Sequence, residues 1–561
     1  MNLSPRRVLP AVAFALFAAT LAPVSAAPAR LTDVRIPMSD GVELVGDVRL
    51  PSASGAFPVI LVMSPYGRED QESPSTLTRD YLGHGYAHVN VDIRGTGKSD
   101  GALCLFCDRE QQDVYEVVEW IAVQSWSDGK VGMQGGSYLA ISQLLGAAKQ
   151  PPHLRAIVPE VPYTDTYRDI VWHNGIWNQQ FMSLWTGLQA GLGLQGAAQS
   201  RRLPDRAFNA LAIEFKNAPL DGPTYWERSV YPKFDRIKVP TLLMSGWFDG
   251  FSRGTIRNFQ GIASERKRLI MGPQPHTPPG PPFDPLSPYA PVPPSPGAAD
   301  PPLAWFDRFL KGIPNGIENE PPVLYYDIGA FEWRAASAWP PADATVRTLH
   351  LSGERAGSID SLNDGSLTDA PPSGSATYPD SYRSDPSVGV TEVNGKWGNV
   401  AAAPFVRHDQ TPDAIRQLTY TTAPLPAPLT LAGPMELRFH GETDQADTDW
   451  IVKVADVAPD GSSLLLSSGY LRASHRAVDE ARSLPAEPWI ANTATSVVWP
   501  NDPMLYRIDI WPVAAELQPG HRLRIMIASA DMPNHEPLSQ VSRNTVHHSA
   551  LYPSQLLLTV R

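Results

Sequence analysis

The segment 131-VGMQGGSYLA-140 places Ser137 between small residues, directly after a short run typical of a β-strand. A nucleophilic serine needs a sharp turn from strand to helix that exposes its Oγ, and small neighbours allow that turn. Gly135 lies two positions before the serine, where this turn calls for a glycine. Leu139 lies two positions after it, and the small residue Ala140 follows one step later. The segment therefore indicates either a nucleophile or a structural Gly-Ser turn, and the neighbouring segments must decide between these two interpretations.

The chain around this segment predicts a parallel sheet. The runs 57-FPVILVMSPYG-67 and 86-YAHVNVDIRG-95 are apolar and continuous, as in strands that are buried on both faces. Apolar residues at helical spacing predict an amphipathic helix over 113–124. Because strands alternate with helices, we predict an α/β fold, with an opening hairpin at 33–50 and further strands at 154–159, 241–245 and 268–271. Ligands bind such sheets outside the carboxyl ends of the strands, where Ser137 lies.

Length and composition exclude several classes of protein. A chain of 561 residues is too long for one hydrophobic core, so we expect two or three domains. A hydrophobic content of 42% and a charged content of 19% are typical of a globular protein rather than a disordered one. The net charge of −12 argues against nucleic acid and against an anionic membrane surface as partners.

The first residues are typical of a secretory signal peptide. Arg6 and Arg7 precede an apolar region, and Val24-Ser25-Ala26 offers a small-residue cleavage site. The apolar region contains two prolines and is short for a membrane span. We therefore expect residues 1–26 to be removed and the mature protein to be secreted or periplasmic, without a membrane partner.

The chain has two cysteines, Cys104 and Cys107, in the motif CLFC. In an oxidising compartment they can close a local disulfide. A thioredoxin-like redox role requires the pair at the start of a helix, whereas the next helix is expected about six residues later, near Asp113. Two soft ligands are also too few for a metal site. We therefore predict a local disulfide that stabilises a loop.

Two residues that follow later strands complete the set that a nucleophilic serine needs. Serine requires a base within hydrogen-bond reach, and the base requires a carboxylate that holds its tautomer. Asp249 follows the strand 241–245, and His276 follows the strand 268–271. An Asp beside a Gly is otherwise a turn residue, and a His in a Pro-rich loop is otherwise solvated. The order Ser, Asp, His, each after a strand, predicts a catalytic triad.

Two other polar groups are interpreted as structural. Asp92 and Arg94, in 92-DIRGTG-97, lie at a strand end, where such residues usually pair or cap a turn. The acids of 442-ETDQADTDW-450 match no dedicated calcium loop, so we interpret them as a solvated turn.

Taken together, these segments resemble the cocaine-esterase and X-Pro dipeptidyl-peptidase type of α/β-hydrolase, which includes glutaryl-cephalosporin acylases and α-amino-acid ester hydrolases. Ala140 stands where that family usually has glycine, and Gln274-Pro275 stand where it usually has Trp-Ser. The resemblance rests on 64-SPYGRED-70, 92-DIRGTGKSDG-101, 119-EWIAVQSWSDGKVGMQGGSYLA-140, 245-SGWFDGF-251, 272-GPQPH-276, 305-WFDRFLKG-312 and 447-DTDWIVKVADVAPDG-461.

The resemblance implies two oxyanion donors, the phenolic O–H of Tyr66 and the backbone N–H of Tyr138. It implies no metal or organic cofactor. Short alternating strands after about residue 340 predict an all-β sandwich, and the resemblance implies that it is a jelly roll of the galactose-binding type. We therefore predict a hydrolase core in two parts, 27–163 and 236–335, with a helical cap at 164–235 and the β-sandwich at 340–561.

Aromatic residues near the proposed site favour a bulky apolar ester as the small-molecule substrate, with Trp172, Trp247 and Phe248 as candidate contacts. An α-amino-acid ester hydrolase would be expected to carry acids after the catalytic Asp, where this chain has Gly250 and Phe251. Amide substrates of the X-Pro dipeptidyl-peptidase or glutaryl-acylase kind remain an alternative, because esters and amides share the same triad. The contrasting class is an inactive scaffold whose sandwich binds carbohydrate. The sequence does not predict the oligomeric state.

Overall fold

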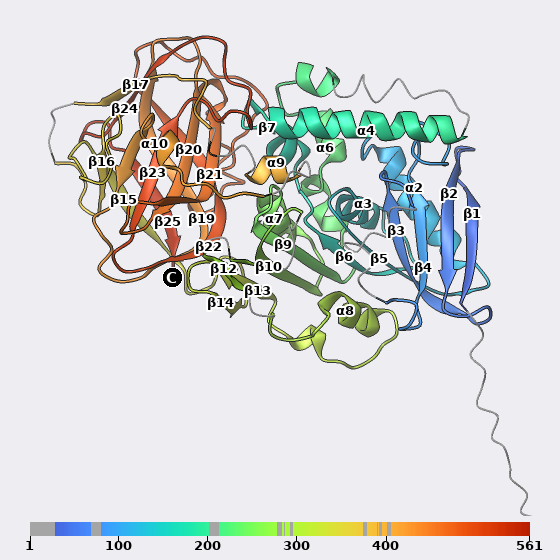
Figure 1. The fold of residues 1–561 in the computed structure, drawn as a ribbon. Helices are drawn as coiled ribbons and strands as arrows, with labels where there is room; N and C mark the ends of the chain where they lie inside the picture. The colour runs from blue at the N-terminus through green and yellow to red at the C-terminus, as the bar shows by residue number, and fades with distance from the viewer. Residues whose placement is uncertain are drawn as a thin grey trace, which may run out of the picture.

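The structure is a computed structural model. It describes residues 28–68, 80–200, 213–277, 283–284, 287–291, 295–373, 378–389, 391, 395–400 and 405–561. The predicted signal peptide, 1–26, lies outside the described residues. Figure 1 shows a mixed α/β body beside a strand-rich body formed by the C-terminal part of the chain. Within the described ranges, no helix is long and apolar enough to cross a membrane.

A ten-stranded sheet forms the centre of the first body, in the order β1-β2-β4-β3-β5-β6-β9-β10-β13-β14. The strands from β4 to β13 pair in parallel, and β1, β2 and β14 are antiparallel. Burial on both faces explains the continuous apolar runs. The bounds are β1 Ala29–Pro37, β2 Glu43–Leu50, β3 Phe57–Ser64, β4 Ala87–Asp92, β5 Ser127–Gly136, β6 Leu154–Glu160, β9 Thr241–Phe248, β10 Lys267–Pro275, β13 Val323–Asp327 and β14 Glu332–Ala336.

Helices cover both faces of this sheet. Helices α2 (Asp108–Ala122), α3 (Tyr138–Ala147) and α7 (Ser252–Gly261) contribute to one hydrophobic cluster. Helix α8 (Pro301–Phe309) packs Trp305 and Phe306 into a second cluster with alternate residues of the same strands. The α/β expectation is thus confirmed. The Pro-rich segment before α8 contains the short pair β11 (Phe283–Asp284) and β12 (Ser287–Pro291).

Helix α2 begins earlier than the sequence pattern indicated. Its first residue is Asp108, with Cys107 as the N-cap, rather than a residue near Asp113. The apolar periodicity starts only at Val114, so it hides a first turn whose acids, Asp108 and Glu110, suit the positive end of the helix dipole. The predicted disulfide between Cys104 and Cys107 is confirmed, and it lies at a helix start after all.

The cap segment is also less uniform than expected. The cap at 164–235 was expected to be helical, but its first part comprises the π-helix η2 (Thr166–Val171), the pair β7 (Trp172–His173) and β8 (Ile176–Trp177), and then α4 (Gln179–Ser200). The dipeptide Asn174-Gly175 causes the break, because both residues have positive φ, as a tight hairpin turn requires. Helix α6 (Pro223–Arg228) and η3 (Tyr231–Arg236) complete the segment.

The C-terminal body is strand-rich, as predicted. Its eleven-stranded sheet closes on itself because β19 pairs with β22, β24 and also β25, which gives a barrel-like shape. The jelly-roll type stays a prediction. The strands are β15 Thr345–Ser352, β16 Gly365–Thr368, β17 Asp380–Arg383, β18 Leu418–Thr421, β19 Leu429–Thr443, β20 Asp449–Val457, β21 Ser463–Arg472, β22 Met504–Leu517, β23 Arg522–Ala528, β24 Arg543–His547 and β25 Gln555–Val560. The helices of this part of the chain are α9 Lys396–Val400, α10 Thr411–Ala414 and η6 Ala473–His475, whereas η4 Ile317–Asn319 belongs to the first body.

Buried ion pairs join the two bodies. Arg253 of α7 donates to Asp169 of η2 at 2.6 Å and to Asp509 of β22 at 2.9 Å. All three side chains are less than 5% exposed. Because removing one partner of a buried pair leaves an uncompensated charge, these contacts fix the bodies in one arrangement.

Candidate active site

The nucleophile position lies on a sharp turn between β5 and α3. Ser137 has φ 59° and ψ −120°, a backbone conformation that is strained for a residue with a side chain. Its N–H donates to the Glu160 carbonyl of the neighbouring strand at 2.9 Å, which holds the turn in place. Gly135 has φ 132°, and a Cβ there would lie 2.7 Å from Cβ of Leu139. A glycine is therefore required at position 135, because a side chain there would strain the backbone and would clash with Leu139.

His276 and Asp249 meet at the ends of adjacent strands. His276 Nδ1 lies 2.8 Å from Asp249 Oδ1, and the aspartate is fully buried. The same carboxylate accepts hydrogen bonds from the Phe251 N–H at 2.8 Å and from Ser245 Oγ at 3.1 Å. These two donors compensate for the burial of the negative charge, and they orient the Asp249 carboxylate toward the imidazole. The pair has the geometry in which a carboxylate fixes the histidine tautomer.

The loop that carries His276 is held by a residue that the sequence reading missed. Asn399 of α9 accepts a hydrogen bond from the Thr277 N–H at 2.8 Å and donates to the Thr277 carbonyl at 3.1 Å. Within the loop, the Gln274 side chain donates to the Ser245 carbonyl at 3.2 Å. Asn399 lies 123 positions beyond His276 in a short helix, so no local pattern connects the two. A segment of the C-terminal half thus completes the histidine loop.

Tyr66 extends from the end of β3 toward the nucleophile. Its hydroxyl faces the side chains of Trp185, Ser137 and Gln189. Burial raises the pKa of Tyr66, and those three polar side chains offset part of the rise. The phenol therefore stays protonated at neutral pH and remains a hydrogen-bond donor beside Ser137.

A buried arginine anchors the loop that carries Tyr66. Arg68 donates to Asp92 at 2.6 Å and to Asp47 at 3.0 Å. All three side chains are at most 7% exposed. Arg94, two positions beyond Asp92, instead pairs with Asp113 of α2 at 2.5 Å. Both residues of the DIRGTG motif are thus engaged in structural ion pairs, as predicted.

Tyr138 is the first residue of α3, so its backbone N–H belongs to the unpaired first turn of that helix. Its side chain points away from this role. The hydroxyl donates to the Glu110 carboxyl at 2.8 Å, and the ring lies against Phe106 with centroids 3.9 Å apart. The side chain of Tyr138 is therefore held by Glu110 of α2 and by Phe106, which precedes that helix.

One aromatic ring contacts the histidine, and rings of the cap and of α9 pack around that ring. Phe251 contacts His276 edge to face at 5.0 Å between centroids, and Phe181 of α4 contacts Phe251 at 5.9 Å. Phe181 also stacks on Trp185 at 5.5 Å and lies 6.3 Å from Trp397 of α9. Figure 1 shows α4 crossing above the first body with α9 beside it. This arrangement gives the site an apolar roof.

The three predicted substrate contacts lie in different places. Trp172 is in the core of the cap, where its indole N–H donates to the Phe215 carbonyl at 3.1 Å. Trp247 donates to the Tyr326 carbonyl at 2.7 Å and packs on Trp339. Phe248 lines a pocket together with Trp397, Phe405 and Tyr470 among others. The structure gives Trp172 and Trp247 structural contacts, and a substrate role for any of the three stays a prediction.

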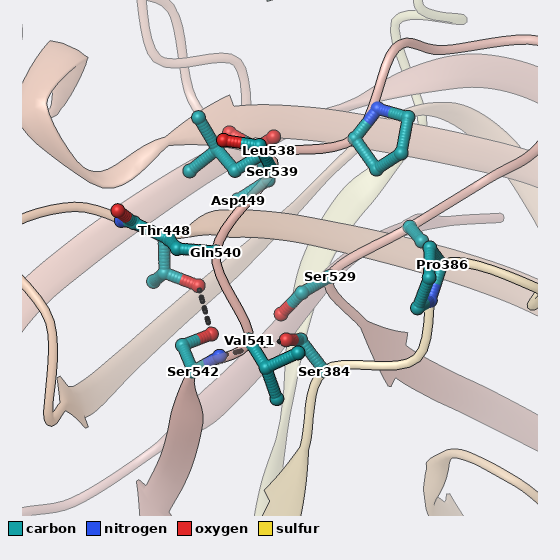
Figure 2. A pocket seen from close by; sticks show the side chains of 12 residues that line it. Ser384, Pro386, Thr448, Asp449, Ser529, Leu538, Ser539, Gln540, Val541 and Ser542 are labelled. Carbon is teal, nitrogen blue, oxygen red and sulfur yellow. Dashed lines mark hydrogen bonds between the residues drawn. The ribbon is translucent and has the colours of Figure 1, made fainter.

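The acidic segment 442–450 differs in part from the solvated turn that we expected. Asp449 is 1% exposed and pairs with Arg472 at 2.8 Å, because it begins β20 and faces β21. Asp449 also lines a pocket in the C-terminal body, whose wall is rich in hydroxyl groups (Figure 2). Among the described residues, no group of three or more His, Cys, Asp or Glu side chains is arranged to hold a metal.

Comparison with known proteins agrees with this architecture. Residues 40–278 match the family described as X-Pro dipeptidyl-peptidase (S15 family), and residues 315–557 match the X-Pro dipeptidyl-peptidase C-terminal non-catalytic domain. A cocaine esterase of Rhodococcus is 28% identical over 94% of this chain and 98% of its own.

Two solved structures share the fold. An α-amino-acid ester hydrolase superposes with a TM-score of 0.78 at 23% identity, covering 99% of this chain and 98% of its own. A CocE/NonD family hydrolase of Staphylococcus aureus superposes with a TM-score of 0.75 at 22% identity, covering 95% and 93%. At these identities the likeness establishes the fold of the whole chain and leaves the substrate open.

Proposed function

We propose that this protein cleaves carboxylic esters through an acyl-enzyme on Ser137. The premise is that the chain belongs to the cocaine-esterase and X-Pro dipeptidyl-peptidase type of α/β-hydrolase and is a serine hydrolase. The observation that carries the proposal is the 2.8 Å contact between His276 and Asp249, at the ends of β9 and β10 in the same parallel sheet whose strand β5 ends at Ser137. A phenol hydroxyl beside the serine supports it further.

The proposed reaction begins with proton transfer from Ser137 Oγ to His276 Nε2 while Oγ attacks the ester carbonyl carbon. Asp249 stabilises the imidazolium that forms. The Tyr66 hydroxyl and the Tyr138 backbone N–H donate to the developing oxyanion, which is where fixed donors lower the barrier most. The tetrahedral intermediate then expels the alcohol, which takes the proton from His276.

Deacylation repeats these steps with water as the nucleophile. His276 removes a proton from the water as its oxygen attacks the acyl carbon, and the collapse of the second intermediate returns the proton to Ser137 Oγ. The products are the carboxylic acid and the restored enzyme, so the cycle balances without a cofactor.

The aromatic roof supports a bulky apolar ester as the substrate. Phe251 contacts His276, Phe181 packs on Phe251, and Trp185 stacks on Phe181. Apolar rings of this kind bind apolar acyl or alcohol groups. The family match to X-Pro dipeptidyl-peptidases keeps amide substrates as the second candidate. The disulfide supports an exported protein, because such bonds persist in oxidising compartments.

The test is turnover of p-nitrophenyl esters of graded size and of aminoacyl and prolyl p-nitroanilides, with wild type and Ser137→Ala side by side. We expect ester turnover that rises with apolar bulk and is lost in Ser137→Ala. Preference for prolyl anilides would move the assignment to the peptidase candidate. Absence of turnover, together with no labelling of Ser137 by a fluorophosphonate, would contradict the proposed enzymatic function. The carbohydrate-binding scaffold would then be the remaining interpretation.

A further inference from the structure

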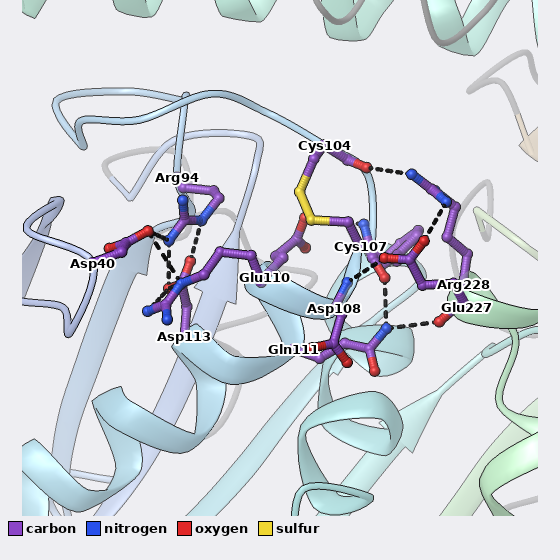
Figure 3. Close-up of a disulfide and its surroundings, with 12 residues drawn as sticks. Asp40, Arg94, Cys104, Cys107, Asp108, Glu110, Gln111, Asp113, Glu227 and Arg228 are labelled. Carbon is purple, nitrogen blue, oxygen red and sulfur yellow. Dashed lines mark hydrogen bonds and ion pairs between the residues drawn. A yellow bond between two sulfur atoms is a disulfide. The ribbon is translucent and has the colours of Figure 1, made fainter. Parts of the chain in front are cut away.

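The disulfide closes a tight turn directly before α2, at residues 104–107, and Figure 3 shows this turn and its surroundings. Leu105 and Phe106, the two residues inside the turn, both have positive φ, at 49° and 60°. Bulky residues rarely adopt this conformation, and two in succession persist only where the surroundings impose it. Cys107 is also the N-cap of α2, so the disulfide ties the turn to the first residue before that helix.

The turn makes two contacts with Tyr138. The Phe106 ring lies on the Tyr138 ring with centroids 3.9 Å apart, and it is 3% exposed. The Phe106 N–H donates to one oxygen of the Glu110 carboxyl at 3.0 Å. The Tyr138 hydroxyl donates to the other oxygen of the same carboxyl at 2.8 Å. The ring face and the hydroxyl of Tyr138 are thus both fixed by groups that depend on the conformation of Phe106.

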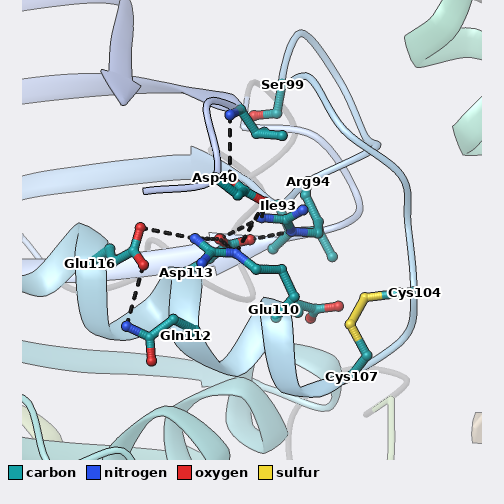
Figure 4. Close-up of polar contacts among 12 residues, drawn as sticks. Asp40, Ile93, Arg94, Ser99, Cys104, Cys107, Glu110, Gln112, Asp113 and Glu116 are labelled. Atoms are coloured by element: carbon teal, nitrogen blue, oxygen red, sulfur yellow. Dashed lines mark hydrogen bonds and ion pairs between the residues drawn. A yellow bond between two sulfur atoms is a disulfide. The ribbon is translucent and has the colours of Figure 1, made fainter. Parts of the chain in front are cut away.

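Charged groups around the turn hold α2 in place. Arg94 donates to Asp113 at 2.5 and 2.7 Å and to Asp40 at 3.1 Å, and Arg109 donates to Asp113 at 2.8 Å (Figure 4). On the other side, Gln111 donates to the Phe106 carbonyl at 2.7 Å. The helix is therefore anchored independently of the disulfide, and the turn is the part whose conformation the disulfide controls.

We propose that the disulfide-closed turn is a redox-sensitive positioning device for the oxyanion hole, in which Phe106 and Glu110 hold Tyr138 so that its backbone N–H points at the reacting carbonyl. The proposal rests on the proposed function, because it needs Tyr138 as an oxyanion donor. Phe106 and Glu110 act only through Tyr138, so they are positioning residues. A consequence is that the enzyme reaches its full turnover only where the disulfide forms, which suits an exported protein.

The reductive step is a thiol–disulfide exchange. A dithiol attacks one sulfur of the bond, its second thiol resolves the mixed disulfide, and a cyclic disulfide leaves. The protein gains two electrons and two protons, as the thiols of Cys104 and Cys107. Both cysteines are half-buried rather than enclosed, so a small dithiol can reach them. Because the chain has only two cysteines, reduction changes no other bond.

The experiment compares ester turnover of the wild-type protein before and after treatment with dithiothreitol, with thiol titration to show that two thiols appear. We expect kcat to fall about tenfold while KM changes less than about twofold, since complete loss of one oxyanion donor costs about 10²–10³. Affinity for an arylboronic acid, whose tetrahedral adduct occupies the oxyanion hole, should fall in the same proportion. Reoxidation should restore both.

Two variants serve as controls. Cys104→Ser with Cys107→Ser should show the kcat of the reduced enzyme and no response to dithiothreitol. Phe106→Leu keeps the disulfide and removes the ring contact, so it should lower kcat and boronic-acid affinity with KM unchanged.

The outcomes separate the two proposals. Absence of turnover before reduction would contradict the proposed function. Normal turnover that is unchanged in the fully reduced protein would overturn the positioning role. If reduction or the double serine variant unfolds the protein, as near-ultraviolet circular dichroism would show, Phe106→Leu decides, and an unchanged kcat there overturns the inference.

Discussion

The two walls of the candidate active site are built in different ways. The strand-end wall consists of residues at the ends of β3, β5, β9 and β10, namely Tyr66, Ser137, Tyr138, Asp249 and His276. The facing wall comes from α4 of the cap and α9 of the C-terminal half, namely Phe181, Trp185, Gln189, Trp397 and Asn399. The first wall holds polar groups in fixed directions, and the second supplies mainly apolar surface. The comparison teaches that chemistry and enclosure are supplied by separate parts of the chain, so changes to the two walls should have separable effects.

The largest effect should come from the carboxylate of the strand-end wall. We expect Asp249→Asn to lower kcat by about 10⁴, because an amide no longer selects the histidine tautomer that accepts the serine proton. Asparagine has the same shape as aspartate and fills the same buried space, so folding should be retained. Burst and steady-state kinetics on a p-nitrophenyl ester measure the loss.

Ser245→Ala is the matched control for Asp249→Asn, since it removes only one donor to the same carboxylate. It should cost less than about tenfold in kcat, in line with the loss of a single neutral hydrogen bond. A loss in Asp249→Asn no larger than that of the control would contradict the assignment of Asp249.

Tyr66→Phe should have the next largest effect. Removing the phenol hydroxyl takes one donor from the proposed oxyanion hole, which costs about 10²–10³ in kcat with little change in KM. Steady-state kinetics on one ester, with the thermal stability of the variant measured in parallel, tests this. A variant that raises KM with kcat intact would instead place Tyr66 among the groups that bind substrate.

Ser137, Asp249 and His276 of the strand-end wall were predictable because each follows a strand that a local pattern indicates, whereas Tyr66 and Tyr138 were predicted only from the resemblance to a known family. Continuous apolar runs marked β3, β9 and β10, and the glycine at 135 marked the turn at Ser137. Because these strands are parallel, their carboxyl ends lie at one edge of the sheet. Disulfide formation between Cys104 and Cys107 was predictable for the same reason, since the two are three positions apart.

The facing wall was not predictable in the same way. Asn399 reaches Thr277 across more than a hundred residues, and no period or motif links them. Trp172 was predicted as a substrate contact, and its indole N–H donates to a backbone carbonyl within the cap. The acids at the start of α2 precede its apolar period, which is why the helix start was placed five residues late. Contacts of this kind depend on tertiary packing, which local patterns do not encode.

Glu110, which accepts a hydrogen bond from Tyr138 of the strand-end wall, should make the stability of the protein depend on pH. Burial raises the pKa of Glu110 to about 7, against its ordinary value of 4.5. Between these values the folded protein holds a proton that the unfolded chain releases, so this group's contribution to stability falls as pH rises from about 4.5 to 7. Glu110→Gln removes the titration. We expect wild type to lose about 3 kcal/mol relative to Glu110→Gln over that range.

Chemical denaturation at a series of pH values measures this difference, and titrations common to both proteins cancel. Glu116, on the same helix, is the matched control. Its pKa is lowered to about 2, despite partial burial, by hydrogen bonds from Arg109 and Ser39. Its stabilising effect is present above its ordinary pKa of 4.5 and is lost as pH falls toward 2, so Glu116→Gln should show no added slope between pH 5 and 7. A flat difference for Glu110→Gln would contradict the raised pKa.

The smallest effect should come from the polar residue of the facing wall. Asn399→Ala removes both hydrogen bonds to Thr277 and leaves its backbone groups without that partner, which should cost about 1–3 kcal/mol of stability. His276 keeps its 2.8 Å contact with Asp249, so kcat should fall only a few-fold. Asn399→Asp is the matched variant, because it keeps the acceptor for the Thr277 N–H and loses the donor to the carbonyl. It should therefore fall between wild type and Asn399→Ala in thermal stability. If Asn399→Ala instead lowered kcat as much as Asp249→Asn does, the two walls would not be separable, because the facing wall would be holding the histidine in its reactive position.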